Sequence, residues 1–127
     1  MGINLLIVDD SASTRQVIER TVRITDPDLG ECHHASNGRE ALEILRRAWI
    51  DLIITDLHMP EMDGRTLLHH IRKVEMWRNI PVAIVTSERS DQTELEVMEM
   101  GATTYQKKPL TPELMKELIE TLKERMP

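Results

Sequence analysis

Five short strand-like segments alternate with five helix-like segments, and this alternation limits the possible folds more than any other feature of the sequence. The strand-like segments span residues 3–8, 31–35, 51–55, 81–85 and 103–107. The first of them is apolar at every position except Asn4, as expected for a strand that is buried on both faces of a sheet. Regular alternation of this kind requires right-handed crossovers, so the sequence predicts an α/β fold with helices on both faces of a parallel sheet.

The segments between the strands carry start and stop signals for helices. Asn37 and Glu40 stand at the spacing of a capping box before the second helix. Gly101 follows the fourth helix as a left-handed C-cap, and Thr111 and Pro112 occupy the cap and first position of the fifth. The first helix is expected to bury the apolar side chains of Val17, Ile18, Val22 and Ile24.

Polar side chains follow four of the five predicted strands, at the point where each strand ends. Asp9 and Asp10 follow the first strand, Asp56 the third, Thr86 the fourth and Lys108 the fifth. Ligands of open α/β sheets bind at this carboxyl edge, where the strand order reverses. The second strand is followed by no charge, which predicts a doubly wound, five-stranded sheet of order 2-1-3-4-5 with the second strand outermost.

The residue types at this edge indicate a particular chemistry. Three carboxylates that lie close together repel one another unless a cation is bound between them. Oxygen ligands with room for water suit Mg²⁺ better than zinc or a calcium cage. An ionised Asp56 next to such a cation can attack phosphorus, with Lys108 as a second cation and the Thr86 hydroxyl as a hydrogen-bond donor. The residues therefore predict a carboxylate that accepts phosphate as an acyl phosphate.

Four motifs together resemble the receiver domain of two-component response regulators. They are Val-Asp-Asp at residues 8–10, Asp-Leu-His-Met-Pro-Glu-Met-Asp-Gly at residues 56–64, Thr-Ser at residues 86–87 and Lys-Pro at residues 108–109. Each motif alone is weak, but all four occur in order on the expected elements and cover essentially the whole chain. The resemblance is to single-domain regulators of the chemotaxis type, and it implies one receiver domain over residues 1–127 with the flavodoxin-like receiver fold.

The resemblance also implies roles for individual residues. Asp56 would be the phosphoacceptor. Asp10 and Asp56 would bind Mg²⁺ together with the backbone carbonyl of His58, and Asp9 would contribute directly or through water. Lys108 would pair with Asp56 before phosphorylation and with the phosphoryl group afterwards.

The resemblance also implies a conformational switch and residues that control the lifetime of the phosphoryl group. Thr86 would be drawn toward the phosphoryl group, and Tyr105, the only tyrosine of the chain, would leave an exposed rotamer to fill the vacated space. The fourth helix, fifth strand and fifth helix would then present a changed face to a partner. His58 and Glu88 would flank the phosphoryl group and tune its loss to water. The Lys108–Pro109 peptide is expected to be cis.

Composition limits the partners and the location. The chain has 16 Lys and Arg against 22 Asp and Glu, a net charge of −6, and no basic run, which argues against direct nucleic-acid binding. Its apolar runs are too short for membrane insertion, and the lone Cys32 is typical of a reducing compartment, so the expected location is the cytoplasm. The expected partners are a sensor histidine kinase or phosphotransfer protein and a downstream effector protein.

A competing interpretation is a Mg²⁺-dependent aspartyl-phosphate phosphatase or phosphotransferase. Haloacid-dehalogenase-type hydrolases require a second Asp two residues after the nucleophile, and that position holds His58. The sequence therefore favours a signalling domain that catalyses only its own phosphorylation and slow dephosphorylation, rather than an enzyme. The adjacent pairs His33–His34 and His69–His70 point apart on any strand or helix, which argues against a histidine metal site.

Overall fold

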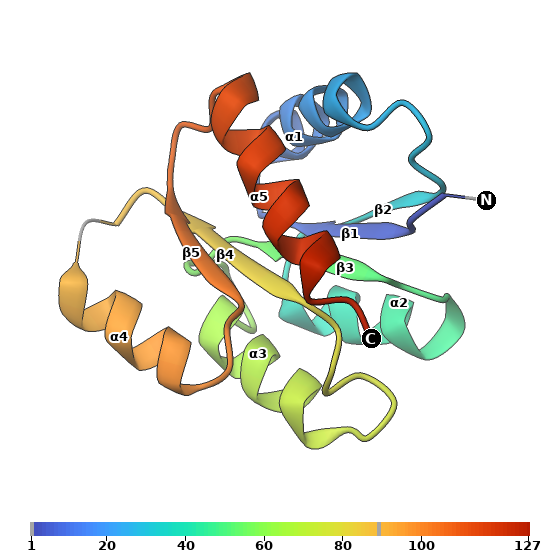
Figure 1. Ribbon diagram of the computed structural model, residues 1–127. Helices are drawn as coiled ribbons and strands as arrows, with labels where there is room; N and C mark the ends of the chain where they lie inside the picture. Colours follow the sequence, from blue (N-terminus) through green and yellow to red (C-terminus); the bar gives the residue numbers. More distant parts are fainter. Residues whose placement is uncertain (1, 89) are drawn as a thin grey trace.

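A computed structural model describes residues 2–88 and 90–127. Over these residues five parallel strands form one sheet in the order β2-β1-β3-β4-β5 (Figure 1). This confirms the predicted topology. The strands are β1 (Leu5–Val8), β2 (Cys32–Ala35), β3 (Leu52–Thr55), β4 (Val82–Thr86) and β5 (Thr104–Lys107).

Helices cover both faces of the sheet (Figure 1). Because side chains alternate along a strand, Leu5 and Ile7 of β1 pack on one face and Leu6 and Val8 on the other. The first face is covered by α1 and α5, and the second by α2, α3 and α4. The helices are α1 (Ala12–Thr25), α2 (Gly38–Arg47), α3 (Gly64–Lys73), α4 (Asp91–Glu99) and α5 (Pro112–Glu124). None of the described helices is both long and apolar enough to cross a membrane.

The helix caps follow the sequence signals. The Asn37 side chain accepts a hydrogen bond from the Glu40 amide at 2.9 Å, and the Glu40 carboxylate accepts one from the Ser36 amide at 2.9 Å. Gly101 has a φ of 107°, which favours glycine, directly after α4 and its C-cap. Thr111 caps α5 with Pro112 in its first turn.

The prediction of which α1 side chains are buried was partly wrong. Ile18 and Val22 are buried, but Val17 is 55% and Ile24 69% exposed. Residues of a helix advance by about 100° each, so Ile18 and Val22 share a face. Val17 is turned away from that face, and Ile24, six residues after Ile18, lies on the far side of the helix. Only the pair with i, i+4 spacing therefore reaches the sheet.

The capping box of α2 gives a prediction about pH. The hydrogen bond from the Ser36 backbone lowers the pKa of Glu40 below its ordinary value of 4.5. A carboxylate with a lowered pKa stabilises the fold above pH 4.5, and this contribution is lost as the pH falls through the folded-state pKa. Because Glu40 is exposed and screened by solvent, Glu40→Ala should lower the free energy of unfolding by only roughly 0.5 kcal/mol at neutral pH.

Urea unfolding near neutral pH and again at about pH 3 measures this effect, which should shrink at the lower pH. Glu43→Ala is the matched control, because Glu43 is an exposed glutamate in the interior of the same helix. An equal, pH-independent change in both variants would show that the capping box contributes nothing.

Candidate functional site

Three aspartates lie together at the carboxyl edge of the two central strands. Asp9 and Asp10 follow β1 and Asp56 follows β3; the ends of these strands are paired in register, Val8 beside Thr55. Each aspartate offers a carboxylate oxygen, and these three atoms lie within 4.8 Å of one another. The sheet thus brings together all three carboxylates that the sequence singled out.

Backbone amides orient two of the three carboxylates. Asp9 Oδ1 accepts a hydrogen bond from the Ser11 amide at 2.9 Å, and Asp56 Oδ1 accepts one from the Leu57 amide at 2.7 Å. The Asp9 side chain is buried, that of Asp56 is 11% exposed, and Asp10 is exposed. Solvent exposure therefore increases across the site, from the buried Asp9 through Asp56 to the exposed Asp10.

Lys108 reaches this cluster from the end of β5. Its Nζ lies 2.8 Å from Asp9 Oδ2 and 3.3 Å from Asp56 Oδ2, so it contacts both carboxylates and not Asp56 alone, as the sequence had suggested. Burial alone would lower the pKa of Lys108, but hydrogen bonding and attraction from Asp9 and Asp56 raise it above its ordinary value. The ammonium is therefore charged at neutral pH. The Lys108–Pro109 peptide is cis, as expected.

The charges and atom types of the cluster fit a hard divalent cation. Three carboxylates against one ammonium leave an excess of negative charge, and every donor atom of the three aspartates is an oxygen. Mg²⁺ prefers this kind of ligand set and keeps several waters when only a few carboxylates bind it. The exposed side of the cluster at Asp10 leaves room for those waters.

A second set of predicted residues forms a chain of contacts along the end of β4. The hydroxyl oxygen of Thr86, which is fully buried, accepts a hydrogen bond from the Glu88 amide at 3.3 Å. Tyr105, which pairs with Ile84 across β4 and β5, donates its hydroxyl to the Glu88 carbonyl at 3.0 Å. The Tyr105 ring is half-buried rather than exposed, and it packs against the hydrophobic core.

His58 joins this chain of contacts from the loop after β3. Its Nε2 lies 2.9 Å from Glu88 Oε1, and its side chain is 59% exposed. Hydrogen bonds from Thr93 and His58 lower the pKa of Glu88. The two residues expected to flank a phosphoryl group therefore contact each other across the mouth of the site.

Gly64 and Arg15 also shape the site, although the sequence predicted no role for either of them. A Cβ on Gly64 would lie 2.3 Å from the Asp56 carbonyl oxygen, so only glycine permits the backbone to pass this close to Asp56. Arg15 donates a hydrogen bond to the Asp9 carbonyl from α1. Gly64 is part of the motif at residues 56–64. Its close approach to the Asp56 carbonyl, however, depends on where the start of α3 packs against the end of β3.

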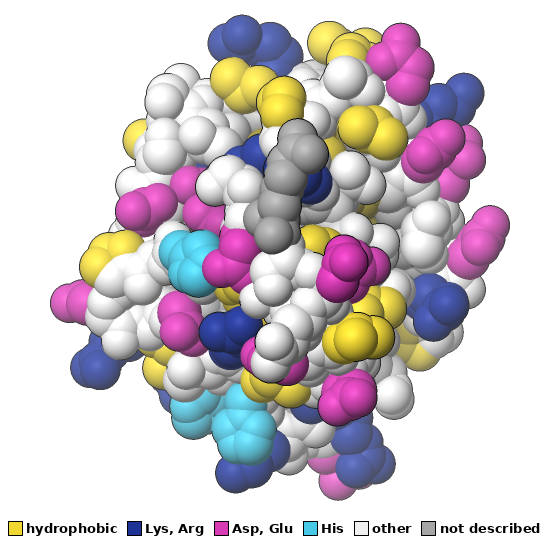
Figure 2. Space-filling model, turned by 90° about the vertical axis from the view of Figure 1, so that its left-hand side faces the viewer, with side chains coloured by type: hydrophobic (Ala, Val, Ile, Leu, Met, Phe, Trp, Pro, Cys, Tyr) yellow, Lys and Arg dark blue, Asp and Glu magenta, His cyan; other side chains and the backbone are white. Residues whose placement is uncertain are grey.

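The surface over α4 mixes apolar and acidic side chains (Figure 2). Leu95 and Met98 are exposed large apolar residues of this helix. Around them lie acidic residues, one of which, Glu96, pairs with Arg65 of α3 at 3.1 Å. In this view lysines and arginines are scattered among acidic side chains. The face that contains α4 is therefore chemically mixed, with apolar side chains open to contact.

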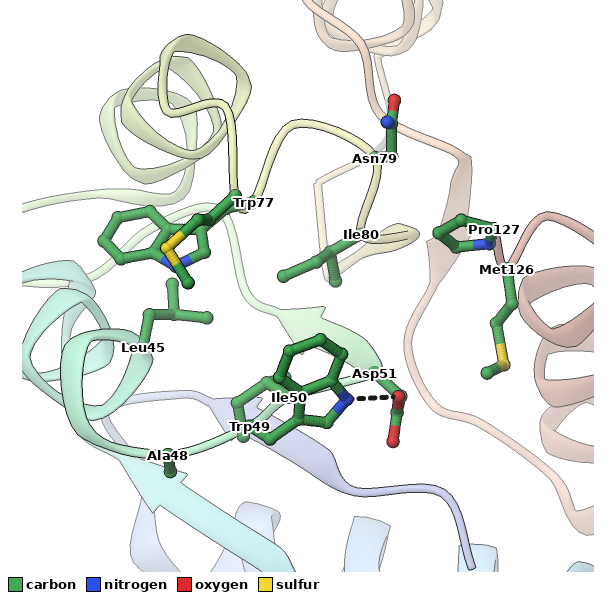
Figure 3. Close-up of a pocket in the computed structure, with 11 residues that line it drawn as sticks. Leu45, Ala48, Trp49, Ile50, Asp51, Trp77, Asn79, Ile80, Met126 and Pro127 are labelled. Atoms are coloured by element: carbon green, nitrogen blue, oxygen red, sulfur yellow. Dashed lines mark hydrogen bonds between the residues drawn. The ribbon is translucent and has the colours of Figure 1, made fainter.

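A separate hollow of about 220 Å³ lies at the opposite edge of the sheet (Figure 3). Asp51 and Ile80, which line it, come just before β3 and β4, whereas Asp56 and Thr86 lie at the other ends of these strands. Trp49, which donates its indole N–H to Asp51 at 2.9 Å, completes one wall. This hollow contains none of the predicted site residues.

Known proteins resemble this chain over nearly its whole length. The family model of the response regulator receiver domain matches residues 5–120 of this chain. The chain is 35% identical to the chemotaxis protein CheY of Pseudomonas aeruginosa over 98% of both proteins, and 32% identical to CheY-3 of Vibrio cholerae over 98% of this chain and 95% of that one. The structure of the chemotaxis response regulator CheY4 of Vibrio cholerae superposes with a TM-score of 0.86 and 32% identity, covering 96% of this chain and 99% of that one.

Proposed function

The chain belongs to the response regulator receiver domain family, and on that premise we propose that Asp56 accepts the phosphoryl group. The observation that carries this assignment is the position of its carboxylate. It clusters with Asp9 and Asp10 and lies 3.3 Å from the Lys108 ammonium, partly open to solvent. Asp9 is buried against Lys108 at 2.8 Å and is less accessible to an incoming donor.

We propose that Mg²⁺ is held by the carboxylates of Asp9, Asp10 and Asp56 and by the backbone carbonyl of His58. The all-oxygen donor set and the excess negative charge support this assignment. When bound, the ion offsets the negative charge of the carboxylates and of the incoming phosphoryl oxygens. Asp9 and Asp10 would therefore keep Asp56 ionised indirectly, by holding the cation that screens it.

The reaction consists of two phosphoryl transfers. A carboxylate oxygen of Asp56 forms a bond to phosphorus while the bond from phosphorus to the donor breaks, and the donor departs with that electron pair. Water later attacks the same phosphorus, which releases inorganic phosphate and restores the carboxylate. Lys108 would shift its hydrogen bond from Asp56 to a phosphoryl oxygen, and the Thr86 hydroxyl would donate to another.

The contacts around Glu88 support a route from this step to the surface. In the present conformation the Glu88 amide is bonded to Thr86 and its carbonyl to Tyr105. If the Thr86 hydroxyl turns to a phosphoryl oxygen, the Glu88 amide loses its partner and the segment that anchors Tyr105 is released. The ring can then occupy a second position, and the face formed by α4, β5 and α5 changes.

The donor we propose is the phosphohistidine of a sensor histidine kinase or phosphotransfer protein, and the receiver of the signal is a downstream effector protein. The mixed apolar and acidic surface of α4 offers Leu95 and Met98 for effector contact. A cytoplasmic location is consistent with the single, unpaired Cys32.

His58 is expected to slow the loss of the phosphoryl group. Its imidazole is fixed by Glu88 beside the site and would shield the phosphorus from water. A contribution of about 1 kcal/mol to the hydrolysis barrier corresponds to roughly a fivefold change in rate. His58→Asn should therefore shorten the lifetime of the acyl phosphate by about that factor, measured by phosphate release after the donor is removed.

The matched control is His70→Asn, which changes an exposed histidine on α3 and should leave the lifetime unchanged. If His58→Asn and the parent lose phosphate at equal rates, His58 has no role in shielding.

The signalling function and the enzyme alternative predict different stoichiometry. A receiver takes about one phosphoryl group per chain from acetyl phosphate and does not turn over phosphomonoesters. A phosphatase releases phosphate from such substrates many times per site. We expect labelling without phosphomonoester turnover; repeated turnover that is lost in Asp56→Asn would support the enzyme instead.

A further inference from the structure

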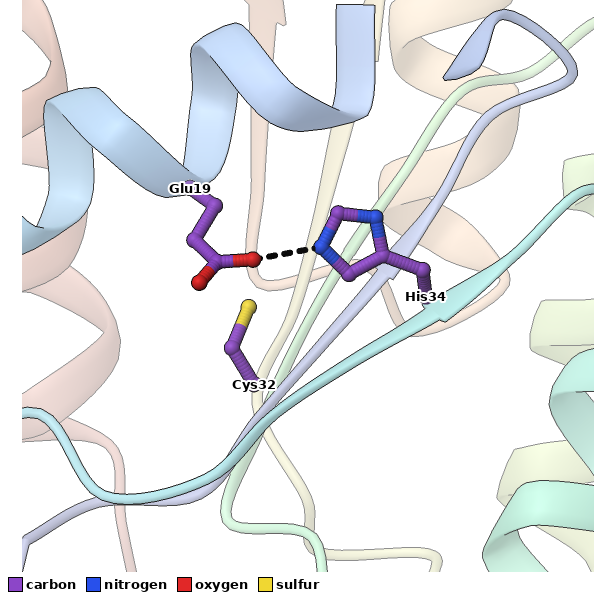
Figure 4. Close-up of side chains that lie close together, drawn as sticks. All are labelled: Glu19, Cys32 and His34. Atoms are coloured by element: carbon purple, nitrogen blue, oxygen red, sulfur yellow. Dashed lines mark hydrogen bonds and ion pairs between the residues drawn. The ribbon is translucent and has the colours of Figure 1, made fainter.

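Glu19, Cys32 and His34 gather on the α1 side of β2 (Figure 4). Cys32 and His34 are two residues apart on this edge strand, so their side chains leave the same face, and α1 brings Glu19 above them. One ligand atom from each, the carboxylate oxygen, the thiol sulfur and an imidazole nitrogen, all lie within 4.8 Å of one another. His34 Nε2 is 2.6 Å from Glu19 Oε1.

This cluster differs from the acidic one in its donor atoms and shares no residue with it. Sulfur, nitrogen and oxygen together are the ligands of zinc and similar borderline metals, whereas Mg²⁺ and Ca²⁺ prefer oxygen alone. From typical zinc–ligand bond lengths, the ligand atoms of a tetrahedral site lie about 3.3–3.8 Å apart. The Cys32 sulfur, which lies within 4.8 Å of the other two donors, would therefore move closer by at most about 1 Å, whereas the His34–Glu19 pair at 2.6 Å would open by roughly 0.7 Å.

We propose that Glu19, Cys32 and His34 form a second metal site, which binds a thiophilic divalent cation with the chemistry of zinc(II). Three protein ligands leave the fourth position to water. The side chains of Glu19 and His34 are each more than a quarter exposed, so this position is accessible from solvent.

The surroundings orient two of the ligands. Arg23 Nε lies 2.9 Å from Glu19 Oε2, which holds that carboxylate and directs the other oxygen toward His34. Arg15 Nε donates to His34 Nδ1 at 3.3 Å, so the imidazole carries its proton on Nε2 in the metal-free protein. Metal binding at Nε2 moves that proton to Nδ1 and opens the contact with Arg15.

The thiol must also release its proton. Burial, together with the nearby Glu19 charge, raises the pKa of Cys32 to about 12. Cys32 is thus a neutral thiol without metal, and binding replaces its proton by the cation.

Cobalt(II) tests the proposal selectively, because a thiolate bound to cobalt gives a near-ultraviolet charge-transfer band and Cys32 is the only cysteine. Titration of the full chain should produce this band with saturation at one ion. Zinc should abolish the band, and excess Mg²⁺ should not. The band should be absent in Cys32→Ser, and His34→Ala and Glu19→Gln should each weaken cobalt binding by roughly tenfold or more.

Two controls separate this site from its surroundings. His33→Ala changes the neighbouring histidine, which faces away and contacts Glu31 at 3.0 Å, and should leave the band intact. Asp10→Asn removes an acidic-cluster ligand and should also leave it intact, which keeps this test independent of the proposed phosphorylation. Circular dichroism verifies that each variant is folded.

The proposal is overturned if the parent gives no band. It is also overturned if the band and its affinity are unchanged in both His34→Ala and Glu19→Gln, since Cys32 would then bind cobalt without them.

Discussion

Asp56→Asn is expected to abolish phosphorylation of the chain by acetyl phosphate. The amide that replaces the carboxylate is uncharged and a poor nucleophile toward phosphorus, and the variant also loses one of the three clustered carboxylates. Intact-protein mass spectrometry should show one added phosphoryl group on most chains of the parent and none on the variant.

Asp63→Asn is the matched control for this substitution. Asp63 lies seven residues away and caps α3 by accepting a hydrogen bond from the Thr66 amide at 2.9 Å. Asparagine caps helices about as well as aspartate, so this variant should fold and be phosphorylated like the parent. Labelling of Asp56→Asn at the parent level would exclude Asp56 as the acceptor.

Thr86→Ala is expected to permit phosphorylation but to disconnect it from the rest of the molecule. Before phosphorylation the hydroxyl accepts a hydrogen bond from the Glu88 amide. After phosphorylation it would donate one to a phosphoryl oxygen. Without it, the Glu88 amide has no hydroxyl partner in either state, so phosphorylation no longer changes the contacts of Glu88 or the position of Tyr105. The expected effect is a nearly complete loss of the phosphorylation-dependent movement of the Tyr105 ring.

Fluorotyrosine labelling measures this movement directly, because Tyr105 is the only tyrosine and gives a single fluorine resonance. Phosphorylation should shift the resonance in the parent and in Thr86→Ser, which keeps the hydroxyl, but not in Thr86→Ala at equal phosphorylation. The same shift in Thr86→Ala would show that Tyr105 responds by a route that does not use Thr86.

Much of the fold could be predicted because the five strands are short and alternate regularly with helices, and because the three central strands are apolar. Once the sheet was predicted to be parallel, Asp9 and Asp56 had to lie at one edge, since carboxyl ends of parallel strands share an edge. The absence of charge after the second strand correctly predicted that β2 is outermost. The strands themselves are shorter than predicted at several ends, for example at Leu5, although the carbonyls of Ile3 and Asn4 still accept hydrogen bonds from the Gly30 and Asp51 amides.

Features that depend on how helices are rotated against the sheet could not be predicted. The Glu19–Cys32–His34 cluster requires a particular rotation of α1 over β2, and neither histidine pair indicated it. Likewise, the sequence did not show that Lys108 lies closer to Asp9 than to Asp56 or that Tyr105 is half-buried. These distances are set by side-chain conformations and loops, for which the residue pattern contains no signal.

The location of the phosphoryl group on the chain tests the central claim most directly. Borohydride reduces an aspartyl phosphate to homoserine, so peptide mapping after treatment with acetyl phosphate identifies the modified residue. We predict homoserine at position 56, formed in the presence of Mg²⁺ and absent when a chelator removes it. Homoserine at position 9 or 10, or equal modification of Asp56 without Mg²⁺, would contradict the account.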